Sequence, residues 1–150
     1  MSDHYEPRKD EWLISTDPLL LDIDTIHNYL STESYWAANI PKAVVHRSIE
    51  HSLCFGVYID HKQAGFARFV TDRATFAYLA DVFILAEHRG KGLSKWLMEM
   101  IHSHPELQGL RRWMLGTKDA HGLYEQSGWT VLDEETRKRF MQRHNRDVYQ

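Results

Sequence analysis

Three β-rich segments follow one another with almost nothing between them, and this run limits the possible folds more than any other feature of the chain. The segments cover Leu53 to Ile59, Gln63 to Thr71 and Thr75 to Leu85, and the connections Asp60-His61-Lys62 and Asp72-Arg73 are short and polar. Antiparallel neighbours can be joined by such tight turns, whereas parallel strands need a crossover of a dozen or more residues. The run therefore predicts an antiparallel meander.

Amphipathic segments lie on both sides of the meander. Upstream, Asp17-Pro18 offers an N-cap followed by a proline, so a helix is expected to begin there, and a second helix is expected from Pro41. Downstream, apolar side chains recur at helical spacing until Pro105. The expected apolar faces are Leu19, Ile23, Ile26 and Leu30; Val44, Val45 and Ile49; and Leu93, Trp96, Leu97, Met100 and Ile101.

Shorter elements complete the expected order. They are strands at Trp12 to Ser15, Arg112 to Thr117, Trp129 to Leu132 and Phe140 to Tyr149, and a short helix at Asp119 to Gln126. Together the elements predict a mixed α/β (α+β) fold. Its central sheet is mostly antiparallel, helices flank it, and one strand–loop–helix unit crosses over.

Composition sets the class of protein. A chain of 150 residues fits one domain, 1–150, that can bury a core without disulfides, and residues 1–8 are expected to be flexible. The balance of 18 basic and 21 acidic residues gives no general attraction to nucleic acid or to a membrane surface. A single cysteine, Cys54, and a polar start without an apolar signal region indicate a cytoplasmic location.

Two further classes find no support. No apolar run approaches the roughly 18 residues of a membrane helix. The chain has ten histidines, but none is accompanied by a cysteine pair or an HExxH spacing, so no metal site is predicted.

The stretch EHRGKGLSKWL, residues 87–97, joins the third β-rich segment to the amphipathic helix. Glycines at a helix N-terminus let an anion approach unpaired backbone N–H groups and the positive end of the helix dipole. A Walker A loop does not fit, because Gly90-Lys91 is followed by Gly92 instead of serine or threonine. A dinucleotide GxGxxG fails as well, since its third glycine would be Lys95.

The stretch resembles the pyrophosphate loop of the GNAT superfamily of N-acetyltransferases, which reads Arg or Gln, two residues, Gly, one residue, then Gly or Ala. Arg89, Gly92 and Ser94 stand at these positions, and Ser94 is larger than the expected residue. The preceding segment, residues 78–85, is similar to the family's acetyl-CoA strand. The segment AHGLYEQSGW, residues 120–129, is similar to its second signature. The chain is thus similar to a small single-domain member of this family.

The resemblance implies acetyl-CoA as co-substrate. Backbone N–H groups of residues 89–94 would bind the pyrophosphate, with Lys91 or Lys95 adding charge at its rim. Main-chain groups around Ile84 would hold the pantetheine arm as an added strand, in a cleft left where the next strand splays away. The residues expected to bind the cofactor are Phe83, Ile84, Leu85, Arg89, Gly90, Lys91, Gly92, Leu93, Ser94, Lys95, Asp119 and Tyr124.

Acetyl transfer to an amine also needs a proton donor for the leaving thiolate and a way to obtain a neutral amine. By resemblance, Tyr124 is the donor, and the N–H of Ile84 is the expected oxyanion contact. Strand alternation places Asp81 with Phe83 and Leu85 on one face and Ala80 with Val82 and Ile84 on the other.

Asp81 is a carboxylate inside an apolar run. It is expected to accept the amine proton or to bind the substrate ammonium, and the competing interpretation is a structural aspartate that caps loop N–H groups. Some relatives carry a glutamate one position earlier, where this chain has Ala80. Tyr35 and Trp36 are candidate acceptor residues, either as an amine-binding aromatic wall or as packing, and Tyr78 is a further candidate on the Ala80 face. Cys54 lies in a core strand, which disfavours an acetyl-cysteine intermediate.

The predicted function is an acetyl-CoA-dependent N-acetyltransferase that moves the acetyl group to a primary amine of a small molecule or peptide by direct attack in a ternary complex. The alternatives are a non-catalytic acyl-CoA-binding regulatory module and a nucleotide phosphate binder. The sequence leaves open the amine, the general base, acyl groups other than acetyl, and the choice between monomer and homodimer.

Overall fold

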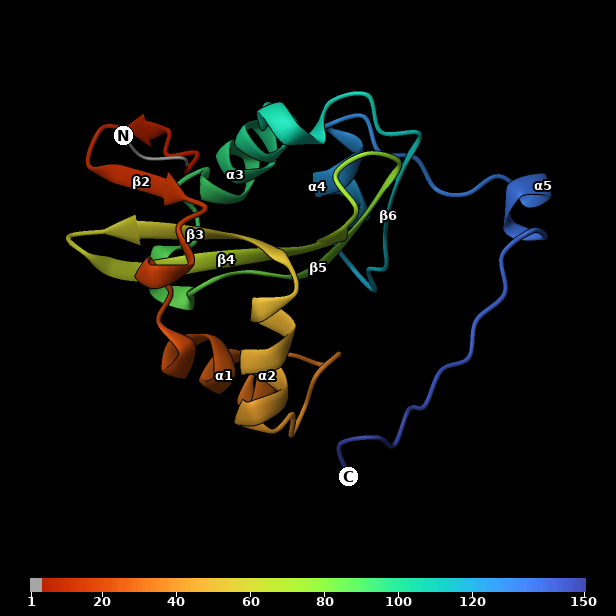
Figure 1. Cartoon of the computed structure of the whole chain (residues 1–150), viewed down its shortest axis with the longest axis horizontal. Helices are drawn as coiled ribbons and strands as arrows, with labels where there is room; N and C mark the ends of the chain where they lie inside the picture. The colour runs from red at the N-terminus through yellow and green to blue at the C-terminus, as the bar shows by residue number, and fades with distance from the viewer. Residues whose placement is uncertain (1–3) are drawn as a thin grey trace.

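The computed structural model describes residues 4–150, and its helices and strands follow the expected order closely (Figure 1). The strands are β1 (Arg8–Lys9), β2 (Trp12–Ser15), β3 (Leu53–Ile59), β4 (Lys62–Thr71), β5 (Phe76–Ile84) and β6 (Arg112–Leu115). The helices are α1 (Ile23–Thr32), α2 (Lys42–Glu50), α3 (Leu93–His102), α4 (His121–Glu125) and α5 (Glu134–Arg137). Three 3-10 turns add η1 (Pro18–Leu20), η2 (Ala86–His88) and η3 (Pro105–Leu107).

All six strands form one sheet in the order β1-β2-β3-β4-β5-β6. Every neighbouring pair from β1 to β5 is antiparallel, and β6 alone runs parallel to its neighbour, β5. The parallel pair is the one joined through a helix, α3, as the crossover rule requires. The predicted fold class, a mostly antiparallel sheet flanked by helices, is confirmed.

Helices cover both faces of the sheet, which accounts for two separate apolar clusters (Figure 1). On one face α1 and α2 bring residues such as Ile26 and Val45 against Phe66 of β4. On the other face α3 brings residues such as Leu97 against Phe55 of β3. Each of these side chains is at most 1% exposed, so both clusters contribute substantially to stability.

The helix predicted from Asp17 begins later than expected. Asp17 does cap a turn, because its carboxylate accepts the N–H of Leu19, but that turn is the short η1. The main helix, α1, has its own N-cap in Asp22, whose carboxylate accepts the N–H of Thr25. Leu19 is 90% exposed and does not belong to the apolar face. The predicted start at Asp17 is therefore wrong for the main helix, because two N-caps five residues apart divide the segment into η1 and α1.

The start of the chain is docked on the sheet over most of the segment expected to be flexible. The Tyr5 N–H donates to Thr16 Oγ1 at 3.0 Å, the Ile14 N–H donates to the Pro7 carbonyl at 3.0 Å, and Ser15 Oγ donates to Glu6 at 2.6 Å. Residues 1–3 lie outside the described part of the chain.

Two predicted strands near the C-terminus are wrong. Residues 129–132 and 140–149 form no strand, and an unpredicted helix, α5, lies between them. From α5 the chain runs as an extended arm beside the body of the molecule (Figure 1). Met141 in this arm is 98% exposed, so an apolar residue in this segment does not indicate a strand buried in the core.

The strand β5 carries a bulge that the period-two prediction missed. Phe66 pairs with Phe83 but Arg68 pairs with Ala80, so β5 has one more residue than β4 in this interval. Asp81 lies in the bulge with φ of +55°. An extra residue shifts the alternation by one. Leu79 therefore shares the α3-side cluster with Val82 and Ile84, and the predicted grouping of Ala80 with Val82 and Ile84 is wrong.

Candidate active site

The strand β5 continues well beyond the end of its pairing with β6. Pairing between β5 and β6 runs only from Phe76 opposite Arg112 to Leu79 opposite Leu115. Beyond Leu79, the β6-facing edge of β5 has no strand partner. The Leu85 N–H donates to the Ala64 carbonyl on the β4 side at 2.8 Å. Alternation turns the N–H and C=O of Ile84 toward the open edge.

The glycine-rich loop leads from this open edge into α3. Gly90 and Gly92 have φ of +79° and +77°, a left-handed conformation that side chains disfavour. Gly92 is the N-cap of α3 and offers no side chain, so the first N–H groups of the helix have no side-chain cap. They border a cavity of about 220 Å³ lined by Ile84, His88, Arg89, Gly90, Gly92, Leu93, Ser94, Lys95 and Leu123.

The Arg89 side chain hydrogen-bonds to two other parts of the protein. Its Nε donates to the Ile84 carbonyl at 2.9 Å, and its Nη2 donates to the Tyr29 hydroxyl in α1 at 2.9 Å. These bonds tie the loop to the end of β5 and to the first helix. Of the main-chain groups predicted to bind the cofactor arm, the Ile84 carbonyl and the Leu85 N–H already have partners, and the Ile84 N–H faces the open edge.

Tyr124 lies in α4, buried, with its ring edge-on to Trp129 at 6.1 Å between centroids. Burial raises the pKa of the Tyr124 phenol to about 12, and Tyr35 adds a smaller effect in the same direction. The hydroxyl is therefore protonated at neutral pH and able to donate. Tyr124 lines a second cavity, of about 320 Å³, between β6, α4 and the segment 129–132, while its neighbour Leu123 lines the loop cavity.

Asp81 is held by two donors. Its Oδ1 accepts Trp36 Nε1 at 2.8 Å, and its Oδ2 accepts Arg68 Nε at 2.8 Å. The side chains of Asp81 and Arg68 are 10% and 17% exposed, so this ion pair is largely withdrawn from water. Arg68 also donates from Nη1 to Ser52 Oγ at 3.1 Å. The pair thus has the additional hydrogen bonds that a desolvated ion pair requires.

The candidate acceptor residues lie around the same end of the sheet. Tyr35 and Trp36 follow α1, are 53% and 41% exposed, and meet edge-on at 5.1 Å. The Tyr35 hydroxyl accepts the Lys118 N–H at 2.8 Å, on the segment after β6. Tyr78 of β5 is 41% exposed, and a Cβ added at Gly116 would lie 3.6 Å from its hydroxyl.

Not every predicted residue lies at the loop cavity. The Phe83 side chain stacks on Tyr29 at 4.1 Å in the core, and Lys91 lies 5.7 Å from the Trp12 ring. Asp119 is exposed just before α4 and lines neither cavity. Cys54 is buried in β3, and burial raises the pKa of its thiol to about 12.

Sequence reasoning missed several residues of the site: Tyr29, Ser52, Arg68, His88, Lys118 and Leu123. One signal was available for Arg68. It is a lone cation within the apolar run of β4, as Asp81 is a lone carboxylate within β5, and two isolated opposite charges in adjacent strands indicate a pair. The others depend on long-range packing, for which the chain carries no local pattern.

Comparison with known proteins identifies the family. The model of the acetyltransferase (GNAT) family matches residues 23–129. A Gibberella zeae protein named as a candidate acetyltransferase is 36% identical, with 76% of each chain covered. A crystal structure from Xanthomonas campestris pv. campestris, described as a candidate acetyltransferase of the GNAT family, is 50% identical. It has a TM-score of 0.89, covering 97% of this chain and 99% of that one.

A crystal structure of a candidate acetyltransferase from Deinococcus radiodurans R1 shares the fold, with a TM-score of 0.71 at 17% identity, covering 97% of this chain and 96% of that one. The chain belongs to the acetyltransferase (GNAT) family. It is an acetyltransferase, and the acetyl donor of this family is acetyl-CoA.

Residues 4–150 contain neither a membrane-spanning helix nor a cluster of metal ligands. Within this range no helix is long and apolar enough to cross a membrane. Nor do these residues contain a group of three or more histidine, cysteine, aspartate or glutamate side chains that could hold a metal ion.

Proposed function

We propose that this protein transfers the acetyl group of acetyl-CoA to a primary amine of a small molecule or peptide, by direct attack in a ternary complex. One observation carries the proposal: the open edge of β5 at Ile84 and the uncapped N-terminus of α3 border the same cavity. A strand edge can hold an extended amide-containing arm, and a helix N-terminus can hold its phosphates. Pantetheine joined to a pyrophosphate has both parts.

The cofactor residues divide by role. The N–H groups at the start of α3 and in the loop 89–94 bind the pyrophosphate, and the exposed Lys95 adds charge at the rim of the cavity. Lys91, whose Nζ lies 5.7 Å from the Trp12 ring centroid, is the second candidate for that role. The Ile84 N–H, turned to the open edge, contacts the pantetheine arm or the thioester oxygen. Asp119 and Tyr124 also stay in the proposal as cofactor-binding residues, because the adjacent Leu123 of α4 lines the loop cavity.

Proton transfer to sulfur is assigned to Tyr124. Its phenol, with a pKa raised to about 12, stays protonated at neutral pH and can donate a hydrogen bond to the leaving sulfur, where a CoA-like thiolate with a pKa near 8.5 develops. The amine enters from the side of Tyr35, Trp36 and Tyr78. Two roles stay open for Asp81, accepting the amine proton or holding its neighbours in place, and each of its oxygens already accepts one protein hydrogen bond.

Two measurements test the proposal. Isothermal titration with acetyl-CoA is expected to show micromolar binding, and no binding at hundreds of micromolar would contradict the cofactor assignment. Free thiol release from acetyl-CoA with a panel of primary amines is expected to identify at least one acceptor. Tight acetyl-CoA binding with no turnover on any amine would favour the non-catalytic acyl-CoA-binding module instead.

A further inference from the structure

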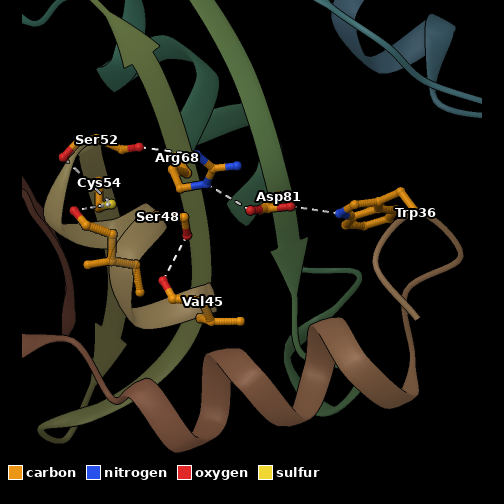
Figure 2. A network of polar contacts seen from close by, with 8 residues as sticks. Trp36, Val45, Ser48, Ser52, Cys54, Arg68 and Asp81 are labelled. Atoms are coloured by element: carbon orange, nitrogen blue, oxygen red, sulfur yellow. Dashed lines mark hydrogen bonds and ion pairs between the residues drawn. The ribbon is translucent and has the colours of Figure 1, made fainter. Parts of the chain in front are cut away.

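A polar network joins four segments that are far apart in the sequence, and it ends on an exposed tryptophan. Figure 2 shows the Asp81 carboxylate between the Trp36 indole and the Arg68 guanidinium, with Ser52 beyond Arg68. The network runs from the turn after α2, through β4 and the bulge of β5, to the loop after α1. Its inner members are largely buried, whereas Trp36 is 41% exposed.

The bulge explains how the carboxylate reaches Trp36. Asp81 has φ of +55°, a conformation that is uncommon for residues other than glycine and that costs about 1 kcal/mol. Strain of this kind persists where the surroundings require it and is concentrated at functional sites. Here the strained residue lies three positions before Ile84, at the open edge of β5 where the thioester is proposed to bind.

The loop after α1 is hydrogen-bonded both to β5 and to the segment that follows β6. Trp36 bonds Asp81 of β5 at 2.8 Å, and the adjacent Tyr35 accepts the Lys118 N–H, after β6, at 2.8 Å. The loop therefore bridges the two strands at the point where they diverge. Lys118 Nζ lies 5.6 Å from the Tyr35 ring centroid, so a cation already lies over that ring. Of the two aromatic rings in this loop, the Trp36 indole is therefore the better surface for a cationic ligand.

We propose that Trp36 is a specificity-determining wall of the acceptor site and that Asp81, braced by Arg68, is the positioning residue that holds it. The proposal rests on the N-acetyltransferase function proposed above, and it identifies the acceptor as an amine that binds as an alkylammonium. An indole face attracts such a cation by cation–π contact. The Asp81–Trp36 bond fixes the ring in place before the amine arrives, which lowers the entropic cost of binding.

Three substitutions separate positioning from proton transfer. Trp36→Phe removes the indole N–H, Asp81→Ala removes the carboxylate, and Asp81→Asn keeps an acceptor oxygen for Trp36 while losing the basic group. Kinetics with acetyl-CoA and n-butylamine, spermidine, lysine or an alanine-initiated tripeptide, whichever is turned over fastest, give KM and kcat for each. Glu106→Gln, which breaks the exposed Arg73–Glu106 pair at the other end of the sheet, is the matched control.

Positioning predicts a change in KM. Trp36→Phe and Asp81→Ala should each raise the amine KM about tenfold, the loss expected for one charge-assisted hydrogen bond, with kcat within about threefold of the parent. The double variant should be no worse than the more affected single one, because both changes break the same contact. Asp81→Asn should restore most of the KM, and acetyl-CoA affinity should not change.

A different pattern overturns the proposal. A fall in kcat of about a hundredfold or more in Asp81→Asn, together with an unaffected Trp36→Phe, would make Asp81 the proton acceptor. Unchanged KM and kcat in Trp36→Phe and Asp81→Ala, with only a lower Tm, would leave a purely structural network. Additive effects in the double variant would show that the two residues act separately.

The anchor itself can be tested without turnover. The ¹⁵N–¹H spectrum of the full chain contains one indole signal that disappears in Trp36→Phe and so belongs to Trp36. In Asp81→Ala this signal should move and exchange faster with solvent, and in Asp81→Asn it should move less. An unmoved signal in Asp81→Ala contradicts the anchor whether or not an amine substrate is known, so failure of this proposal can be told from failure of the proposed function.

Discussion

Single residues decide which chemical steps are open to this enzyme, and Cys54 shows how burial closes one. Cys54 is 5% exposed, and burial raises the pKa of its thiol to about 12. Two smaller effects act in opposite directions, since the charge of Arg68 lowers this pKa and the charge of Asp81 raises it. Only the thiolate is nucleophilic. We predict that Ellman's reagent modifies the native protein very slowly and the unfolded protein rapidly, with one equivalent released.

The same reasoning predicts that Cys54→Ala keeps its acetyl-transfer activity at a temperature where it is folded. Loss of turnover with acetyl-CoA binding intact would instead restore the acetyl-cysteine intermediate that the sequence analysis disfavoured.

Burial also keeps the Tyr124 phenol protonated, and here the proton is useful because the proposed role of Tyr124 is to donate it. We predict that Tyr124→Phe lowers kcat about 10- to 100-fold, at the lower end of general-acid effects because a thiolate is itself a fair leaving group. The affinity for acetyl-CoA should change by less than about threefold. Tyr5→Phe is the control, because Tyr5 is also partly buried but bonds Met100 away from the site. Equal activities of the two variants would remove the acid role.

At the scale of elements, the glycine loop can be tested through its backbone conformation. Nothing lies within 4 Å of a Cβ added at Gly92, but its φ is +77°, so Gly92→Ala should destabilise the protein by about 1–2 kcal/mol through strain alone. Gly122 in α4 also has open space and no positive φ, so Gly122→Ala should stabilise by about 0.5–1 kcal/mol. Urea unfolding measures both, and the same sign for the two variants would contradict the conformational argument.

Acetyl-CoA binding gives a second measure of the loop. Gly92→Ala moves the N–H groups at the start of α3 that the proposed function assigns to the pyrophosphate. Its Kd for acetyl-CoA should therefore rise about tenfold or more under conditions where the variant is fully folded. Equal affinity of the parent and Gly92→Ala would show that the phosphates bind elsewhere.

Elements also mark the limit of what the sequence could predict. The meander and the helix α3 were predictable because both depend on local periodicity and short connections. The bulge at Asp81 was not, since an extra residue in one strand leaves no local signature and is fixed by the pairing of Arg68 with Ala80. The error mattered, because the role of Asp81 depends on the face that it occupies and on Trp36, which lies 45 residues away.

For the whole molecule, the family signature allowed the fold to be predicted, whereas the strands predicted in the C-terminal region were wrong. The assignment of residues 89–94 to the cofactor stays a prediction. Residues 140–149 have an apolar content that suggested a strand, yet no neighbouring edge pairs with them. Tyr149 packs instead near the cluster formed by α1 and α2. Strand formation depends on the partner more than on the segment, so single-sequence reasoning is weakest there.

Global stability should fall steeply at alkaline pH, because several buried groups hold their protons more tightly in the folded chain. Burial raises the pKa of Cys54 and of Tyr124 to about 12 each, from 9.0 and 10.0, and raises that of Tyr58 as well. A raised folded pKa gives stability that is complete below the unfolded value and is lost as pH rises toward the folded value. The loss should therefore begin near pH 9 with Cys54 and deepen above pH 10 with the tyrosines.

Urea unfolding at pH 8, 9 and 10 measures this loss. Cys54 alone should lower the free energy of unfolding by about 1.4 kcal/mol at pH 10 relative to its plateau at lower pH, since one proton is then bound in the folded state and almost none in the unfolded state. In Cys54→Ala the fall between pH 8 and pH 9 should disappear, and the remaining decline should follow the unfolded tyrosines, which begin to ionise near pH 9 and are half ionised near pH 10. A parent protein with the same stability at pH 8 and pH 10, or a Cys54→Ala variant with the parent's pH dependence, would contradict the assignment of the early step to the buried thiol.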